Sequence, residues 1–310
     1  MAQGEHVQLA QSILISWSAG SPVAIDRVRR LSVADRDGGS SGLRFESGDG
    51  IAWIWLDRPE HGNSLTREMQ SELPRLWQAI AADGDVGVVV VTGTGQRHFC
   101  TGTDVKTAAR EGTDRPGRGT SVSEFVRLTA RQNDVWKPVI CAVNGLAAGA
   151  GLHFVVDADI VVAAEGASFT DAHVNVGAVG ALENIGLAKR MPLGSALRLT
   201  LMGRAYRMSA GRAYQLGFVD ELVAPEALLD TCSGMAKAML ENSPAAMAAS
   251  QRAIWQSLEM SYEEALEHGW TLIQQQWEHP DYLEGPRAFA ERRAPVWADR
   301  TRVSGPSEEK

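Results

Sequence analysis

The chain has 310 residues, 44% hydrophobic and 22% charged, which suits one large domain or one domain with appendages and needs no disulfides or metals for its core. The formal net charge of −8 and the pI of about 5.4 argue against a general affinity for nucleic acid, which requires basic surface to replace phosphate counterions. They leave room for a local basic pocket that binds one anionic ligand.

Residues 1–42 differ from the rest and end in the polar, Gly/Ser-rich stretch SVADRDGGSSG, which is typical of a flexible leader. Residues 43–240 alternate strands and helices and predict an α/β core with substantial parallel pairing. Residues 241–310 are expected to form a helical C-terminal region and tail.

The first elements of the core have clear patterns. Two β-rich runs around a Gly-Asp-Gly turn predict a hairpin over 43–57. Residues 63–83 place apolar side chains at helical spacing, with Ser64 or Thr66 as the N-cap. Residues 86–94, VGVVVVTGT, are nearly all β-branched and predict a buried strand.

Further along, a Gly/Arg-rich loop precedes a predicted helix from about Glu124 to Trp136. Buried strands are expected at 138–145 and from residue 160 onward. Beyond about residue 185 the pattern is mainly helical; the expected helices include 208–217, 226–243, 247–260 and 261–279. The last two carry Trp255, Trp270 and Trp277, which we interpret as packing or subunit-interface residues.

Cysteine usage and hydropathy exclude several classes of protein. The three cysteines are scattered and form neither a CxxC pair nor a cluster with zinc-ligand spacing, so we expect reduced thiols and no metal site. Such thiols favour a cytoplasmic location. No apolar run reaches the roughly 20 residues that cross a bilayer, and the first 20 residues lack a signal peptide's basic start.

Two turns rich in small residues suggest chemistry. Residues 101–106, TGTDVK, come soon after one predicted buried strand, and residues 144–153, NGLAAGAGLH, directly follow the next. Small residues let a ligand approach the backbone, and unpaired N–H groups at a helix start favour negative charge. One N–H from each turn could form an oxyanion hole.

Together these segments resemble the enoyl-CoA hydratase/isomerase (crotonase) superfamily over roughly residues 43–297. The matching landmarks are LDRPEHGNSL, HFCTGTDVK, KPVICAVNGLAAGAG, DADIVVAAEGASF, MSAGRAYQLGFVDELV and FAERRAPVW. The resemblance implies a spiral of ββα units with a helical C-terminal trimerisation region, assembled as a homotrimer or homohexamer. It also implies an acyl-CoA substrate, with coenzyme A as part of that substrate and no separate cofactor.

Carried onto this sequence, the resemblance makes the backbone N–H groups of Thr103 and Ala150 the oxyanion-hole donors. Lys106 and Arg292 match positions where the family places cations near CoA phosphates, a role that suits ammonium and guanidinium groups. Arg58 belongs to the same candidate set, but the family's Arg-Pro-Lys motif reads Arg-Pro-Glu here, so one customary lysine is missing.

The resemblance fails at the two catalytic glutamates, because His153 and His173 stand in their places. A histidine can exchange protons near neutrality, and the start of a helix would keep His153 uncharged. Asp171 could orient His173 if the loop folds back. Glu183 and Asn175 are further polar candidates nearby.

This replacement leaves three functions open. The first is a hydratase or lyase reaction on an acyl-CoA thioester, which Lys106 and Arg292 support. The second is carbon–carbon bond hydrolysis of a β-diketone or β-keto thioester, because family members with that activity also have a histidine on the loop that carries His173. The third is a catalytically inactive scaffold, for which the loss of both glutamates is the only argument.

Overall fold

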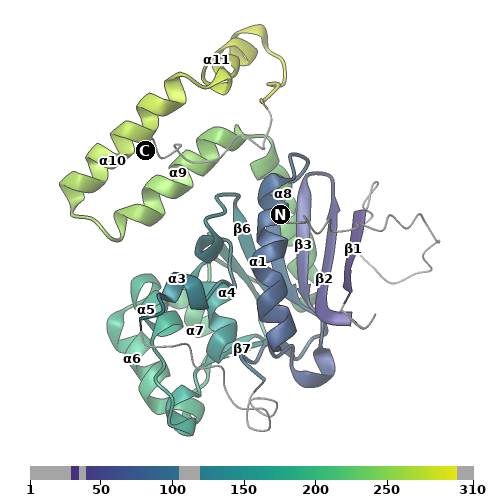
Figure 1. The fold of residues 1–310 in the computed structure, drawn as a ribbon, viewed down its shortest axis with the longest axis vertical. Coiled ribbons are helices and arrows are strands. Elements are labelled where there is room, and N and C mark those ends of the chain that lie inside the picture. Colours follow the sequence, from purple (N-terminus) through teal and green to yellow (C-terminus); the bar gives the residue numbers. More distant parts are fainter. Residues whose placement is uncertain (1–28, 35–39, 105–118, 299–310) are drawn as a thin grey trace, which may run out of the picture.

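The computed structural model describes residues 29–34, 40–104 and 119–298. In these residues the strands form two sheets, one with the order β1-β2-β3-β4-β6-β8-β11 and one with the order β10-β9-β7-β5 (Figure 1). The strands of the larger sheet are β1 (Arg29–Ala34), β2 (Ser40–Gly48), β3 (Ile51–Leu56), β4 (Val88–Gly93), β6 (Val139–Val143), β8 (Ile160–Ala164) and β11 (Glu221–Val223). Those of the smaller sheet are β5 (His98–Cys100), β7 (Leu146–Ala148), β9 (Ser168–Thr170) and β10 (Met208–Ser209).

The predicted hairpin is confirmed as β2 and β3, which pair antiparallel. Its turn residues Asp49 and Gly50 both have positive φ, 52° and 82°, as the two central residues of a type I′ turn do. In the segment assigned to the leader, β1 adds to this hairpin by antiparallel pairing with β2. The predicted leader otherwise lies mostly outside the described residues and stays a prediction.

The spiral arises because the chain visits both sheets in turn. β4 is followed by β5, β6 by β7, and β8 by β9, so each pass gives one strand to each sheet. From β3 to β11 the larger sheet is parallel, and so are β5, β7 and β9. Parallel strands are normally buried on both faces, which explains their nearly continuous apolar runs.

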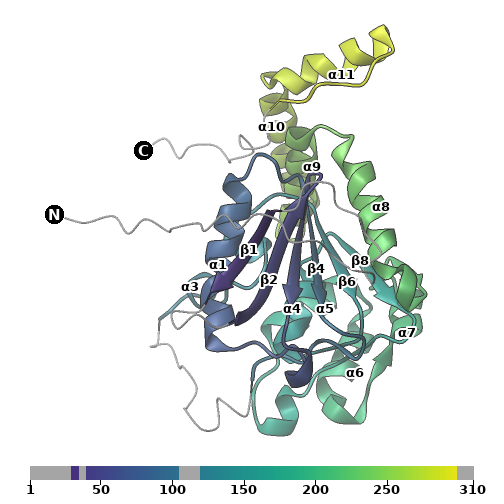
Figure 2. The same cartoon turned by 90° about the vertical axis from the view of Figure 1, so that its right-hand side faces the viewer.

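Helices cover both faces of the larger sheet (Figures 1 and 2). The helices of the described residues are α1 (Arg67–Ala82), α3 (Val122–Phe125), α4 (Leu152–Val156), α5 (Leu182–Arg190), α6 (Leu193–Met202), α7 (Ala210–Gln215), α8 (Leu228–Leu240), α9 (Pro244–Ser257), α10 (Tyr262–Trp277) and α11 (Pro280–Glu291). The predicted cap of α1 is Thr66, whose hydroxyl accepts the Met69 N–H. α1 lies over the main core cluster, and α8 packs on the opposite face of the sheet with Trp53 and Val90.

The predicted helix from Glu124 to Trp136 is wrong. α3 ends at Phe125, and the chain continues without helix to a 3₁₀ turn at Arg131–Asn133. Side chains replace the helical hydrogen bonds at Leu128. Its carbonyl accepts from Trp77 Nε1 at 2.8 Å, and its N–H donates to Gln132 Oε1 at 2.7 Å.

The last helices, α9 to α11, extend away from the two sheets (Figures 1 and 2). One mostly buried carboxylate helps to fix α9 to the core. Asp159 accepts hydrogen bonds at 2.7 Å from the Val139 N–H of β6 and from Gln251 Nε2 and Trp255 Nε1 of α9. Trp255 is therefore a packing residue, as predicted.

We expect Asp159→Ala to destabilise the protein by about 2–4 kcal/mol, because three donors lose their charged acceptor. Urea unfolding followed by circular dichroism measures the change. The exposed Asp230 on α8 provides the control, and Asp230→Ala should change stability by less than about 0.5 kcal/mol. Equal stabilities of the two variants would show that Asp159 does not anchor α9.

Candidate active site

The two small-residue turns lie against each other. β5 and β7 are parallel neighbours, so their carboxyl ends leave the small sheet side by side. Gly102 has a φ of +87°, and a Cβ placed on it would lie 3.0 Å from the carbonyl oxygen of Ala148 and 3.1 Å from the nitrogen of Ala150. Only a glycine allows this approach, because it tolerates positive φ and adds no side chain.

The turns present two backbone donors to one pocket. Neither the Thr103 N–H nor the Ala150 N–H donates a hydrogen bond to another described residue. Both residues line a pocket of about 220 Å³, and His153 lines it as well. One water needs roughly 10–15 Å³ of such space, so the pocket can hold an organic group.

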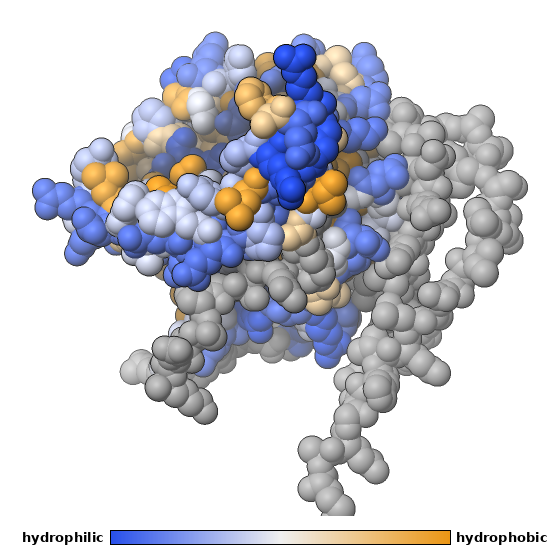
Figure 3. Space-filling view, turned by 90° about the horizontal axis from the view of Figure 1, so that it is seen from above, coloured by the Kyte–Doolittle hydropathy of each residue, from blue (hydrophilic) through white to orange (hydrophobic). Residues whose placement is uncertain are grey.

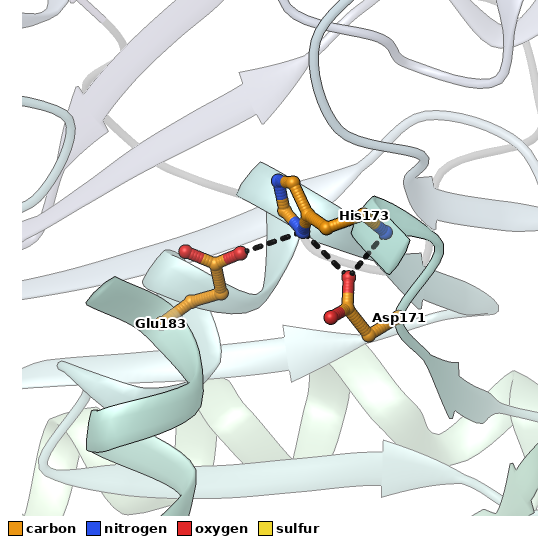
Figure 4. A group of neighbouring side chains, drawn as sticks. All are labelled: Asp171, His173 and Glu183. Atoms are coloured by element: carbon orange, nitrogen blue, oxygen red, sulfur yellow. Dashed lines mark hydrogen bonds and ion pairs between the residues drawn. The ribbon is translucent and has the colours of Figure 1, made fainter. Parts of the chain in front are cut away.

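His173 is held by two carboxylates (Figure 4). Its Nδ1 lies 2.6 Å from Asp171 Oδ1 and 3.0 Å from Glu183 Oε1. Asp171 is completely buried, and its other oxygen accepts from Asn184 Nδ2 at 2.8 Å. The loop thus folds back as the sequence analysis required. The ring also lies beside the second turn, with Cε1 3.7 Å from the position of a Cβ on Gly149.

His153 is engaged at both ring nitrogens. Gln132 Nε2 lies 3.1 Å from His153 Nδ1, while Gln132 Oε1 accepts the Leu128 N–H. The amide orientation therefore makes Gln132 a donor and His153 Nδ1 an acceptor. The proton of a neutral His153 then sits on Nε2, which lies 3.4 Å from Glu183 Oε2.

The two histidines have opposite electrostatic environments. Burial lowers the pKa of His153 below its usual range, although Glu183 opposes the shift. Burial, more than any helix end, thus keeps this ring neutral. The hydrogen bond to Asp171 raises the pKa of His173 against the effect of burial, and the charge of Glu183 adds to the rise. Two neighbouring titratable groups whose pKa values are shifted in opposite directions are typical of acid–base sites.

Asp171, His173 and Glu183 place one potential ligand atom each within 4.8 Å of one another, a spacing that one metal ion could bridge. The donor set does not fit a metal in this arrangement. The 2.6 Å separation between His173 Nδ1 and Asp171 Oδ1 is that of a charge-assisted hydrogen bond, so a proton occupies the nitrogen's lone-pair direction.

Of the three predicted CoA-binding cations, the structure describes Arg58 and Arg292, and it does not bring these two together. Lys106 lies outside the described residues. Arg58 is partly buried and donates to the Ser64 carbonyl at 2.8 Å and to Asp104 at 3.4 Å, so it holds the first turn in place. Arg292 ends α11 with a φ of +53°, on the helices that extend away from the turns (Figure 1).

Sequence reasoning missed Gln132, which joins His153 to Asp157 by donating to the Asp157 carboxylate at 3.0 Å. Burial raises the pKa of Asp157, while Thr129 and nearby arginines limit the rise. Asn175, which was a further polar candidate beside Glu183, accepts the Arg204 N–H and makes no hydrogen bond to the side chain of His153 or His173 among the described residues. None of these contacts leaves a local sequence signal, because each joins segments from different loops.

Comparison with known proteins supports the site's context. The enoyl-CoA hydratase/isomerase family model matches residues 46–300. The chain is 31% identical over 263 residues to (E)-benzylidenesuccinyl-CoA hydratase of Thauera aromatica, covering 82% of this chain and 98% of that protein. It is 33% identical over 273 residues to carnitinyl-CoA dehydratase of Citrobacter koseri, covering 84% and 100%.

Solved structures agree with this match. An enoyl-CoA hydratase/isomerase from Mycobacterium paratuberculosis superposes with a TM-score of 0.75 at 35% identity, covering 83% of this chain and 98% of that one. An enoyl-CoA hydratase from Mycobacterium tuberculosis H37Rv gives a TM-score of 0.74 at 30% identity. With its two-sheet spiral and paired turns, this chain belongs to the enoyl-CoA hydratase/isomerase (crotonase) family.

Proposed function

We propose that the protein adds water to, or removes water from, an acyl-CoA thioester across the bond between C2 and C3. The observation that carries this proposal is the pocket shared by the Thr103 N–H, the Ala150 N–H and His153, with His173 beside the second turn. The hydratase and dehydratase names of the relatives give it additional support.

The thioester oxygen would accept hydrogen bonds from the N–H groups of Thr103 and Ala150. Water addition at C3 turns the thioester into an enolate, and two fixed donors stabilise the charge that develops on its oxygen. They need no reorganisation at that moment, because the positions of both turns are already set by the small sheet and by the contact at Gly102.

His173 would move the proton. Among the described residues its Nε2 has no partner, whereas both nitrogens of His153 are engaged. Neutral His173, with its Nδ1 proton held by Asp171, can take a proton from water at Nε2 as the oxygen attacks C3. The same nitrogen can then return a proton to C2 of the enolate, which completes the addition.

His153 would act as a positioning residue for Glu183. Its Nε2 lies 3.4 Å from one oxygen of that buried carboxylate, and the other oxygen lies 3.0 Å from His173 Nδ1. A neutral His153 can stand beside this carboxylate without adding a second positive charge next to His173. Glu183, in turn, adds negative charge beside His173 Nδ1, whose proton is held by Asp171.

Carbon–carbon bond hydrolysis is the second candidate, because an imidazole held by a buried aspartate can equally direct water at a ketone carbon. The two reactions are separated by assaying trans-2-enoyl-CoA thioesters for loss of the conjugated double bond and β-diketones for carboxylate release. Turnover of the diketone alone would refute the hydratase proposal. Turnover of neither would favour the inactive scaffold.

Oligomerisation as a trimer or hexamer is also proposed for this chain. Its support is apolar surface on the C-terminal helices, visible among hydrophilic residues at that end of the molecule (Figure 3). Trp270 and Trp277 are 48% and 45% exposed and pack edge to face at 5.4 Å.

None of the described helices has the length and hydropathy of a membrane span. The predicted cytoplasmic location stays a proposal.

The first test concerns the oxyanion hole. We expect Gly102→Ala to lower kcat/KM for an enoyl-CoA about 100-fold, because a methyl group at this contact displaces the two donors relative to each other. Stopped-flow spectrophotometry measures the rate. Gly166→Ala is the control, since a Cβ there meets open space. Unchanged activity in a folded Gly102→Ala protein would contradict the assigned donors.

The second test separates the two histidines. His173→Gln should lower kcat about 10²- to 10⁴-fold, the usual contribution of a general base. His153→Gln keeps a side-chain amide that can donate to Glu183, so it should retain more activity than His153→Ala. If both His153 variants lose as much activity as His173→Gln, His153 takes part in proton transfer and its positioning role is wrong.

The third test is the pH dependence. A general base works above its pKa, so kcat/KM should rise with pH through the raised pKa of His173, above the usual 6.5. Asp171→Asn removes the largest cause of the raised His173 pKa, so the rising limb of the kcat/KM profile should move to lower pH while kcat falls. Asp230→Asn, at an exposed site, should leave the profile unchanged. An unmoved limb in Asp171→Asn would exclude His173 as the titrating base.

A further inference from the structure

We propose that the acyl group of the substrate carries a carboxylate of its own and that Arg127 recognises it. This inference rests on the proposed function, because it assigns the acyl end of the same pocket. The pocket that contains Thr103, Ala150 and His153 is also lined by Arg127. The other residues of the wall are Gln70, Pro74, Glu124, Phe125, Val126 and Leu128.

Arg127 has no ion-pair partner among the described residues. Most arginines around it are engaged: Arg75 with Glu72, Arg252 with Asp134, and Arg131 against the ring of Trp255. Arg127 is half-buried and lines a pocket in which no described residue is its counterion, so its guanidinium can bind a carboxylate with two parallel hydrogen bonds.

The position of Arg127 is fixed by its backbone. Its carbonyl accepts from the buried Asn133 side chain at 3.0 Å. The next residue, Leu128, is held by Trp77 through its carbonyl and by Gln132 through its N–H. A cation on a segment held this firmly loses little freedom on binding, so it can discriminate between ligands instead of adapting to them.

The other charged side chain of the wall has a hydrogen-bond partner of its own. Glu124 is the other charged residue of the wall, and its carboxylate accepts the Ser121 N–H at 2.9 Å as part of the capping box of α3. It is therefore satisfied at the helix start, whereas Arg127 is not. A neutral chain would cover the guanidinium without replacing its hydrogen bonds to water, which is unfavourable.

Binding of saturated thioesters tests the inference without any need for turnover. Adipyl-CoA and hexanoyl-CoA have six-carbon acyl chains that differ by a terminal carboxylate. Calorimetry of the full-length protein should show adipyl-CoA binding at least about tenfold more tightly. Arg127→Gln should abolish this preference while leaving hexanoyl-CoA affinity within about twofold. Arg75→Gln, which removes an exposed charge from α1, should retain the preference.

The outcomes distinguish the two proposals. Equal affinity of the wild type for both thioesters would overturn the inference. An equal loss of affinity for both thioesters in Arg127→Gln would also overturn it, because Arg127 would then bind the CoA moiety. The unsaturated pair, 2,3-dehydroadipyl-CoA and trans-2-hexenoyl-CoA, then tests the reaction. A retained binding preference without hydration of either would refute the proposed function and leave the assignment of Arg127 standing.

Discussion

The site depends on the parallel pairing of β5 and β7, two strands of only three residues each. This pairing brings two strand ends to one point, and the glycine at position 102 lets the backbones approach until the first turn touches Ala150. The larger sheet and its helices make such short strands possible, because they bury both faces of the fold and fix where each strand leaves it. The donors, the pocket and the position of His173 all follow from this contact.

Buried carboxylates organise the rest of the site. One continuous chain of polar contacts runs from Asp157 through Gln132, His153, Glu183 and His173 to Asp171. One acceptor of this network, Glu183 Oε1, is buried and makes no hydrogen bond among the described residues, which is costly in a low-dielectric interior. The acids differ from the family's usual glutamates in position, yet they supply negative charge to the same region.

Local patterns in the sequence were enough to predict the hairpin, α1 with its cap at Thr66, and the buried strands, because periodicity and turn residues are short-range signals. The resemblance placed His153 and His173, and their acidic partners were candidates only because they lay close in sequence. Gln132 was missed, since its side chain contacts His153 and Asp157, which lie 21 and 25 residues away. The helix expected over 124–136 was wrong because the side chains of Trp77, which is distant in sequence, and Gln132 take the hydrogen bonds at Leu128 that a helix would have made.

Gln132 has a consequence for how the pocket and the proton network communicate. The Leu128 N–H donates to its carbonyl oxygen, so a 180° flip of the amide would place the Gln132 NH₂ group against the Leu128 N–H, two donors without an acceptor. That single backbone group therefore selects the tautomer of His153 two side chains away. A shift of the wall at Leu128 would free this amide to rotate, and its carbonyl oxygen would then require the proton of His153 on Nδ1. The pocket wall and the histidine are thus coupled through one side chain.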